Sequence, residues 1–163
     1  MFVNGILFLT NLSRNIRMLS VEFIPSRTAA HLGRPLLKIV RIYARDFFMV
    51  NVILMDEEFD KVESEVRLVQ INTTAAREHG GKMERGIRLI KERAWGFIST
   101  CKFTVLPRQF RIHLLYFYFM WLNATPKPNG ILDKFSPREL ILRRRLGFNK
   151  HCCRDFGEYI QAH

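Results

Sequence analysis

The chain has 163 residues, enough for one domain with its own hydrophobic core, and its 48% apolar and 25% charged residues are ordinary for a globular protein. Its net charge of +11 is unusual, and residues 81–163, with 16 basic and 6 acidic residues, carry most of the excess. Three cysteines are too few for a disulfide framework, and the most apolar stretch, residues 112–122, is too short to cross a membrane, so we expect a reducing intracellular compartment and no membrane segment.

The first half of the chain predicts a β-hairpin, a helix and a central strand. Residues 2–12 and 18–24 are β-rich runs joined by a polar turn, which is typical of an antiparallel hairpin. Residues 28–45 have apolar side chains at helical spacing, and Pro35 should either move the helix start to Arg34 or kink the helix. The apolar run at 47–55 predicts a strand buried on both faces.

The second half predicts mainly helices. We expect, in order, a short acidic helix at 57–66, a strand at 67–71, a loop at 72–81, an amphipathic helix at 82–99 and a buried apolar helix at 108–123. Proline and basic residues then become frequent, so residues 125–163 should form a basic extension of a core at 1–124. Within this extension, Arg143-Arg144-Arg145 could equally contact phosphate or be a solvated surface.

Glu84 stands out in the helix at 82–99. Helical spacing places it on one face with Arg88, Lys91 and Trp95. From this helix alone, an ordinary ion pair with Arg or Lys is the favoured interpretation, and a catalytic carboxylate is the alternative. The two basic residues and the aromatic side chain would suit a nucleic-acid surface, as would a polyanionic partner for the whole basic half. A basic surface kept for solubility remains the competing interpretation.

Asp56 stands where the predicted central strand ends, the edge at which α/β folds collect catalytic groups. An aspartate there also often caps the next helix, and the two interpretations have equal weight. Two carboxylates from different elements could together bind a hard divalent cation such as Mg²⁺. Such ions can activate a water or hydroxyl and stabilise the leaving oxygen of a phosphodiester.

The ordered series EHGGKMERGIRLIKERAWGF, LPRQFRIHLLYFYFMWLNATPKPNGILDKFSPRELI and FNKHCCRDFGEYIQAH, together with FVNGILFLTNLSRNI and ILMDEEFDKV upstream, resembles the integrase of copia-type LTR retrotransposons over nearly the whole chain. The resemblance implies an RNase H-like α/β fold with a mixed five-stranded sheet flanked by helices, incomplete at strand one and followed by an irregular C-terminal extension. It also implies a DDE polynucleotidyl transferase that uses Mg²⁺ or Mn²⁺ for DNA integration.

Several residues take roles from this resemblance. Asp56 matches the second catalytic aspartate and Glu84 the glutamate, both as metal ligands. Gly80 and Gly81 correspond to the mobile loop before the catalytic helix. The expected nucleic-acid contacts are Lys82, Arg85, Arg88, Lys91 and Trp95. The implied partners are element ends and target DNA, with a homo-oligomer expected and a nuclear location if the protein is functional.

The chain departs from the family pattern at its start. The first aspartate of the triad belongs on strand one, yet no Asp precedes Asp46, so the resemblance implies an N-terminally truncated core. The segment between Asp56 and Glu84 is also shorter than in retroviral integrases. We therefore expect an integrase core fragment that binds nucleic acid and is catalytically inactive by itself. The alternative is a domesticated or relic nucleic-acid-binding protein without enzymatic activity.

Overall fold

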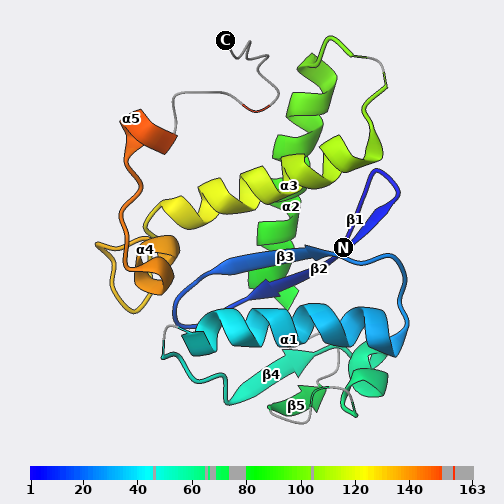
Figure 1. The fold of residues 1–163 in the computed structure, drawn as a ribbon, viewed down its shortest axis with the longest axis vertical. Helices are drawn as coiled ribbons and strands as arrows, with labels where there is room; N and C mark the ends of the chain where they lie inside the picture. Colours follow the sequence, from blue (N-terminus) through cyan, green and yellow to red (C-terminus); the bar gives the residue numbers. More distant parts are fainter. Residues whose placement is uncertain are drawn as a thin grey trace.

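The computed structural model describes residues 1–45, 47–64, 66, 69–73, 80–103, 105–151 and 156. Within them the elements run in the order β1 (Phe2–Val3), β2 (Ile6–Leu12), β3 (Leu19–Phe23), α1 (Ala29–Arg45), β4 (Val52–Met55), η1 (Glu57–Val62), β5 (Gln70–Thr73), α2 (Gly80–Thr100), α3 (Arg108–Ala124), α4 (Pro137–Leu142) and α5 (Phe148–His151). In the view of Figure 1, α2 crosses behind β2 and β3, and α1 runs between these strands and the pair β4–β5.

The first three strands form an antiparallel sheet in the order β1-β2-β3. The predicted hairpin is confirmed as β2 and β3, but the run at 2–12 is not one strand. Asn4 and Gly5 have φ angles of 47° and 74° and turn the chain between β1 and β2. Asparagine and glycine tolerate positive φ, so this Asn-Gly pair is a strong hairpin signal that the sequence analysis missed.

The remaining two strands, β4 and β5, pair in parallel as a separate two-stranded sheet. The five expected strands are therefore present and mixed in direction, although the described ladders do not join them into one sheet. β1 has only two residues in register with β2, and the ladder extends to Met1, whose carbonyl accepts from the Phe8 N–H at 2.8 Å.

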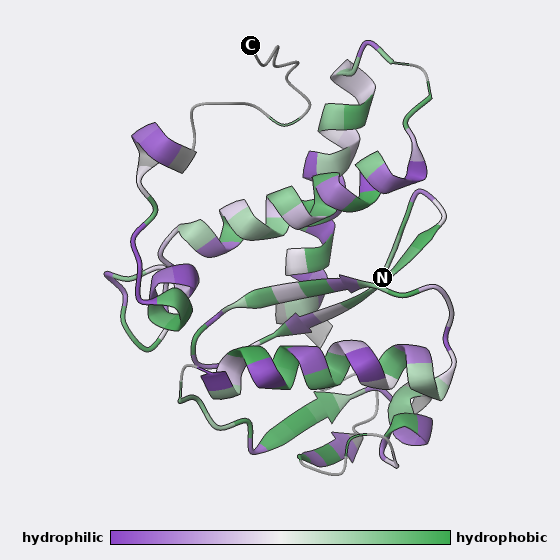
Figure 2. Cartoon of the chain, in the orientation of Figure 1, coloured by the Kyte–Doolittle hydropathy of each residue, from purple (hydrophilic) through white to green (hydrophobic). Residues whose placement is uncertain are grey.

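Alternation along β2 separates the core into two layers. Leu9 packs under α1 with Leu36 and Ile53, whereas Phe8 packs on the opposite face with Ile90 of α2 and other residues of α2 and α3. Successive strand residues point to opposite faces, so a single strand can serve both layers. Hydrophilic and hydrophobic bands follow one another along α1 in Figure 2, as expected of a helix with one face on the sheet.

Of the two outcomes expected at Pro35, a helix start at Arg34 was wrong, and a kink stays a prediction. The helix does not begin at Arg34 but at Ala29, and Pro35 lies inside it. A proline inside a helix lacks the backbone hydrogen bond to the residue four positions earlier, and its ring crowds the carbonyl of that residue. The buried face of α1, which includes Leu32, Leu36 and Ile39, packs against the sheet and compensates for that loss.

The predicted strand at 47–55 was too long at its start. β4 begins only at Val52, and the side chains of Phe47 and Met49 are 84% and 88% exposed. Phe47 has a φ of 65° and follows the end of α1, where its N–H bonds the carbonyl of Ala44. An apolar run therefore did not mean burial here. The strand predicted at 67–71 overlaps β5, which spans Gln70–Thr73, and positions 67 and 68 lie outside the described residues.

Helix α3 covers the outer edge of β3. The Leu19 N–H donates to the Asn123 side-chain oxygen at 2.8 Å, and the Asn123 amide donates to the Leu19 carbonyl at 2.6 Å. The Phe23 N–H donates to the Tyr116 hydroxyl at 3.1 Å. An open strand edge is a template for unwanted pairing, and these side chains occupy part of it. The predicted helix at 108–123 is confirmed, with its buried face on this sheet.

The C-terminal extension is irregular over residues 125–136, as predicted, but then forms α4, which the sequence analysis did not predict. Ser136 and Glu139 form a capping box, and Pro137 occupies the first helical turn. Ile141 is fully buried in the layer beneath α1. Among the described residues, no helix is both long and apolar enough to span a membrane.

Candidate metal and nucleic-acid site

Asp56 directly follows β4, at the position the sequence analysis gave it, and its side chain is exposed. It is the residue before η1, but its carboxylate makes no capping hydrogen bond. Only its backbone carbonyl contributes to the turn, by accepting from the Phe59 N–H at 2.9 Å. The capping interpretation of Asp56 is therefore not supported, and the carboxylate is available for another ligand.

Glu84 lies in the second turn of α2 and is exposed. Within the part of the chain that the structure describes, its carboxylate has no ion pair, and Arg88 instead approaches Glu92 at 3.9 Å. The ion-pair interpretation favoured from the sequence is thus not what these residues show. The continuous helix places Glu84, Arg88, Lys91 and Trp95 on one ridge, since positions four, seven and eleven apart fall on the same side.

The cations of this ridge differ in their surroundings. Arg88 is 72% exposed and its contact with Glu92 is long, so that pair holds the guanidinium weakly. Lys91 is half-buried and Arg85 exposed. Trp95 is 62% exposed, which is unusual for so large an apolar side chain and leaves its ring free to stack. Lys82 lies in the first turn of α2, and its side chain is outside the described set.

Gly80 and Gly81 are the first two residues of α2 rather than part of a loop, so the predicted loop at 72–81 was too long at its end. A Cβ added to Gly81 would meet no atom within 4 Å, and its φ is not positive. Neither space nor backbone geometry therefore requires glycine at Gly81. Residues 74–79, which precede the helix, lie outside the described residues, and the mobile-loop role stays a prediction.

The carboxylates of Asp56 and Glu84 fit a hard divalent cation by donor type, since both are exposed oxygen ligands. The described residues contain no group of three or more His, Cys, Asp or Glu that could hold a metal. Two carboxylates alone are an incomplete ligand set. The structure therefore identifies candidate ligands and not a finished metal centre.

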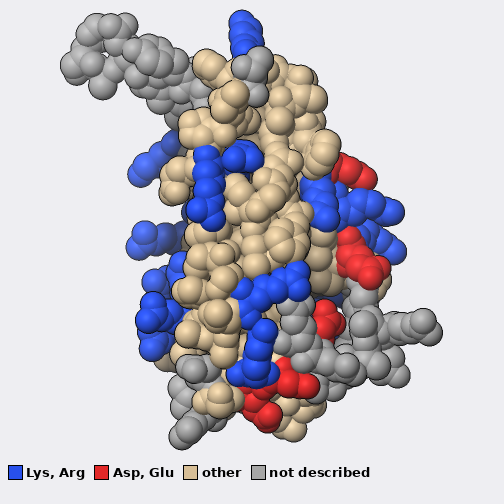
Figure 3. Space-filling model, turned by 90° about the vertical axis from the view of Figure 1, so that its right-hand side faces the viewer, with Lys and Arg blue, Asp and Glu red and all other residues tan. Residues whose placement is uncertain are grey.

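Arg93 and Lys127 form a basic pair that the sequence analysis missed. Burial lowers the pKa of Lys127 below its ordinary value of 10.5, and the nearby Arg93 guanidinium lowers it further. Arg93 belongs to α2, whereas Lys127 comes from the segment after α3. Charge along the chain could not reveal a pair whose members are 34 positions apart. Figure 3 shows Lys and Arg side chains over much of one face, with Asp and Glu mainly at its lower and right-hand edges.

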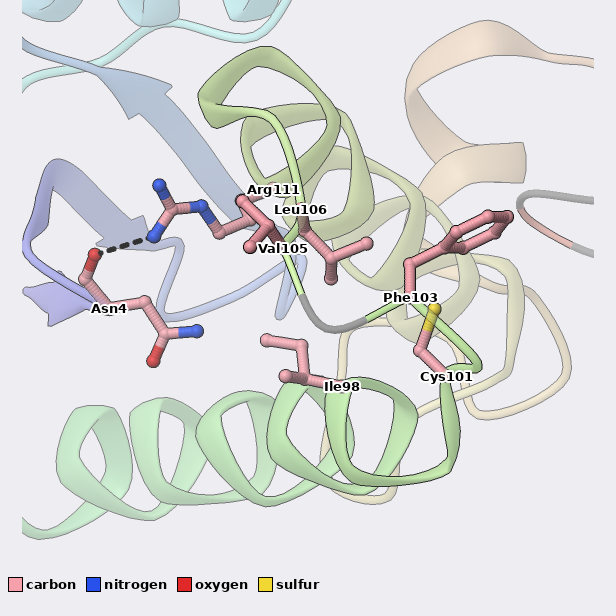
Figure 4. Close-up of a pocket in the computed structure, with 7 residues that line it drawn as sticks. All are labelled: Asn4, Ile98, Cys101, Phe103, Val105, Leu106 and Arg111. Atoms are coloured by element: carbon pink, nitrogen blue, oxygen red, sulfur yellow. Dashed lines mark hydrogen bonds between the residues drawn. The ribbon is translucent and has the colours of Figure 1, made fainter.

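A hollow of about 410 Å³ lies at the far end of α2 (Figure 4). It is lined by Asn4, Ile98, Cys101, Phe103, Val105, Leu106 and Arg111. The Arg111 guanidinium reaches across to the β1–β2 turn and donates to the Asn4 carbonyl at 3.1 Å. None of the predicted site residues lines this hollow, so it is separate from the candidate carboxylates.

No protein-family model matches the chain, and no curated protein sequence matches it. Among solved structures, the chain is similar to the catalytic core domain of BIV integrase, with a TM-score of 0.60 and 18% sequence identity. The match covers 86% of this chain and 88% of that domain, which is almost the full length of both. At this identity the likeness concerns the fold. The chain has the RNase H-like fold of an integrase catalytic core.

Proposed function

We propose that this chain is an integrase-type core that binds DNA through the exposed ridge of α2. The observation that carries the proposal is the pair of exposed carboxylates without ion-pair partners among the described residues, one at the end of β4 and one on α2 beside Arg88 and Lys91. The fold shared with an integrase core supports this assignment. Arg88 and Lys91 would contact phosphates, and the exposed ring of Trp95 would stack on a base or sugar.

Asp56 and Glu84 would hold Mg²⁺ or Mn²⁺ in this proposal. Such an ion, when bound, supplies activation of a hydroxyl and charge stabilisation at the phosphodiester. The residues of this chain contribute oxygen ligands and a basic surface that orients the nucleic acid. This proposal assigns two carboxylates of the given chain to the ion, whereas the family resemblance implies a triad. We therefore expect the chain by itself to bind DNA without cutting or joining it.

The finer assignment is to a copia-type retrotransposon integrase, as the sequence resemblance implies. The DNA substrates would be element ends and a target duplex, the active form a homo-oligomer, and the location nuclear. The roles proposed for Asp56 and Glu84, and for the α2 ridge, do not depend on these details.

Salt dependence of DNA binding tests the α2 ridge. Each phosphate contact contributes about 0.9 to the slope of log K against log salt, so Arg88→Ala with Lys91→Ala should reduce the slope by about two units. Fluorescence anisotropy with a labelled duplex measures it. The matched control, Lys102→Ala with Lys134→Ala, removes two exposed cations outside the ridge and should keep the slope. An unchanged slope in the α2 double variant would exclude this ridge as the contact surface.

Catalytic competence is tested separately, by strand transfer on end-mimic DNA in Mg²⁺ or Mn²⁺. We expect no product, because loss of one metal-binding carboxylate should remove most of the rate. Robust activity that disappears in Glu84→Gln would show that two carboxylates suffice and would overturn the expectation.

The second candidate is a domesticated or relic nucleic-acid-binding protein that has no enzymatic activity. The incomplete set of ligands among the described residues favours it. Metal titration separates the two candidates. In the integrase-type proposal, Mg²⁺ strengthens DNA binding and Asp56→Asn with Glu84→Gln abolishes that strengthening. In the second, DNA binding is independent of Mg²⁺ in both proteins.

A further inference from the structure

The outer side of α1 carries a line of cations, here called the basic track: Arg34, Lys38, Arg41 and Arg45. All four side chains are exposed. Their spacing of four, three and four residues places them on one side of the helix, opposite the buried Leu32, Leu36 and Ile39. At about 1.5 Å per residue the track is roughly 16 Å long.

The composition of α1 sets this track apart from an ordinary solvated face. Its 17 residues include no Asp or Glu, whereas α2 intersperses its cations with Glu84 and Glu92. Basic residues near a helix C-terminus complement the macrodipole, which accounts for Arg45. Arg34 and Lys38 lie too far from that end to benefit. The local architecture thus gives no reason of its own for a four-cation line.

Among the described residues, one acidic side chain from a neighbouring element forms an ion pair with the track, at Lys38. Glu22 of β3 pairs with Lys38 at 2.6 Å, and its side chain is only 18% exposed. Helix η1 contacts α1 and brings the exposed Asp60 and Glu63 near it. No ion pair from either reaches Arg34 or Arg41 among the described residues. The first 80 residues are almost neutral in total, and the four cations of the track nevertheless share one side of α1.

The fold also extends the track with residues that are distant in sequence. The Arg143 guanidinium lies over the Phe47 ring, 5.6 Å from its centre, and Phe47 is two positions beyond the last residue of α1. Ile141, two residues earlier, is buried in the layer beneath α1 and fixes this position. Arg144 follows and is exposed. The run Arg143-Arg144-Arg145, ambiguous in the sequence, thus begins beside the C-terminal end of the track.

We propose that the basic track, continued by Arg143 and Arg144, is a second DNA-binding surface that contacts the phosphate backbone of a duplex. A line of about 16 Å is as long as the axial rise of roughly five base pairs of a duplex, at 3.4 Å each. The track lies on the opposite face of the sheet from α2, because α1 packs on the Leu9 side of β2 and α2 on the Phe8 side. One chain can therefore hold two separate duplex segments. The proposal depends neither on the two carboxylates nor on the α2 ridge.

The test uses the full chain and a labelled 20-base-pair duplex across a salt series. Arg34→Gln with Arg41→Gln removes two track cations without disturbing the Lys38–Glu22 pair. The expected result is a reduction of the salt slope by about two units. Arg34→Lys with Arg41→Lys keeps the charge and should keep the slope. Lys102→Gln with Lys134→Gln serves as the charge-matched control and should also keep it.

Comparing the α1 double variant with the α2 double variant distinguishes this proposal from the proposed function. If both surfaces bind DNA, the reductions in salt slope of the α1 and α2 double variants should add when the two are combined. The wild type should then also bridge two duplexes that carry different fluorescent labels, as measured in a two-colour pull-down. Loss of bridging in Arg34→Gln with Arg41→Gln supports the track. If only the α2 variants lose slope, the track proposal is wrong and the proposed function stands; if only the α1 variants do, the reverse holds.

Two further outcomes would overturn the track proposal. One is an equal loss of slope in the charge-matched control, which would mean that net charge alone governs binding. The other is that the α1 double variant keeps its DNA slope but loses binding to phosphatidylserine vesicles, which would assign the track to a lipid surface. Circular dichroism melts confirm that each variant is folded before binding is compared.

Discussion

The double hydrogen bond between Asn123 and Leu19 offers the sharpest test of how the fold is held together. Asn123→Ala removes a donor and an acceptor from a buried site in which Leu19 is only 8% exposed. Each lost hydrogen bond between neutral groups contributes about 1 kcal/mol, and a backbone group left buried without a partner adds a further penalty. The expected loss in the free energy of unfolding is about 3 kcal/mol, a large part of the 5–15 kcal/mol typical of a domain.

Urea unfolding followed by far-UV circular dichroism measures this loss, and an unchanged m-value confirms that the same surface unfolds. Asn51→Ala, at an exposed position, is the control and should change stability by less than about 0.5 kcal/mol. Asn123→Asp retains the acceptor for the Leu19 N–H but places a second oxygen against the Leu19 carbonyl. It should be destabilised at neutral pH and recover relative to wild type at acid pH, where a protonated carboxyl can donate. A loss below 0.5 kcal/mol in Asn123→Ala would refute the reasoning.

Other consequences concern the C-terminal segment. Ser136→Ala should reduce the free energy of unfolding by about 1 kcal/mol in urea, because the α4 capping box is lost. The backbone hydrogen bond from Ser136 lowers the pKa of Glu139 below its ordinary 4.5. The ionised Glu139 therefore stabilises the fold above pH 4.5, and this stabilisation is lost as the pH falls through the lower pKa of the folded state. In acid titration, Glu139→Gln should not show this fall in the free energy of unfolding. Ile141→Ala should cost about 2–5 kcal/mol in thermal or urea unfolding, as deletion of a fully buried side chain does. Because the pKa of Lys127 is lowered, its cation opposes folding, and stability should rise as the pH increases through the folded pKa towards 10.5; Lys127→Met should abolish this rise.

The helices were the part of the fold that the sequence predicted best. Helix α2 was expected at 82–99 and spans Gly80–Thr100, and α3 was expected at 108–123 and spans Arg108–Ala124. Long elements with a 3.6-residue period carry their signal many times over, so local exceptions do not hide it. The hairpin of β2 and β3 was predictable from two β-rich runs on either side of a polar turn.

The errors arose where a local rule competed with tertiary packing. Pro35 reads as a helix breaker, but the packing of α1 on the sheet outweighs one missing hydrogen bond. Phe47 and Met49 read as buried, yet they are exposed, with the Arg143 guanidinium over the ring of Phe47. The short helix α4 had a readable signal in the Ser-Pro-Arg-Glu order that opens it, which the frequent prolines of this segment obscured.

The candidate site was predictable residue by residue but not as an arrangement. The position of Asp56 after β4 and of Glu84 on the α2 ridge follow from local pattern. The position of Asp56 relative to Glu84 depends on the course of the chain between β5 and α2, and the periodicity of apolar residues does not determine that course. The basic track was overlooked for a different reason, because a charge total over residues 1–80 averages it with the acids around η1.

The burial of Ile141 has a consequence for how the protein is made. The layer beneath α1 is assembled from residues that begin at Leu9, and almost all of it has been synthesised long before Ile141 leaves the ribosome. Until then the nascent chain exposes an apolar gap where α4 will dock, and domains with such late-arriving elements are prone to aggregate. A nascent chain stalled before α4 should therefore be a client of hydrophobic-binding chaperones, and translation speed through its last quarter should influence its yield.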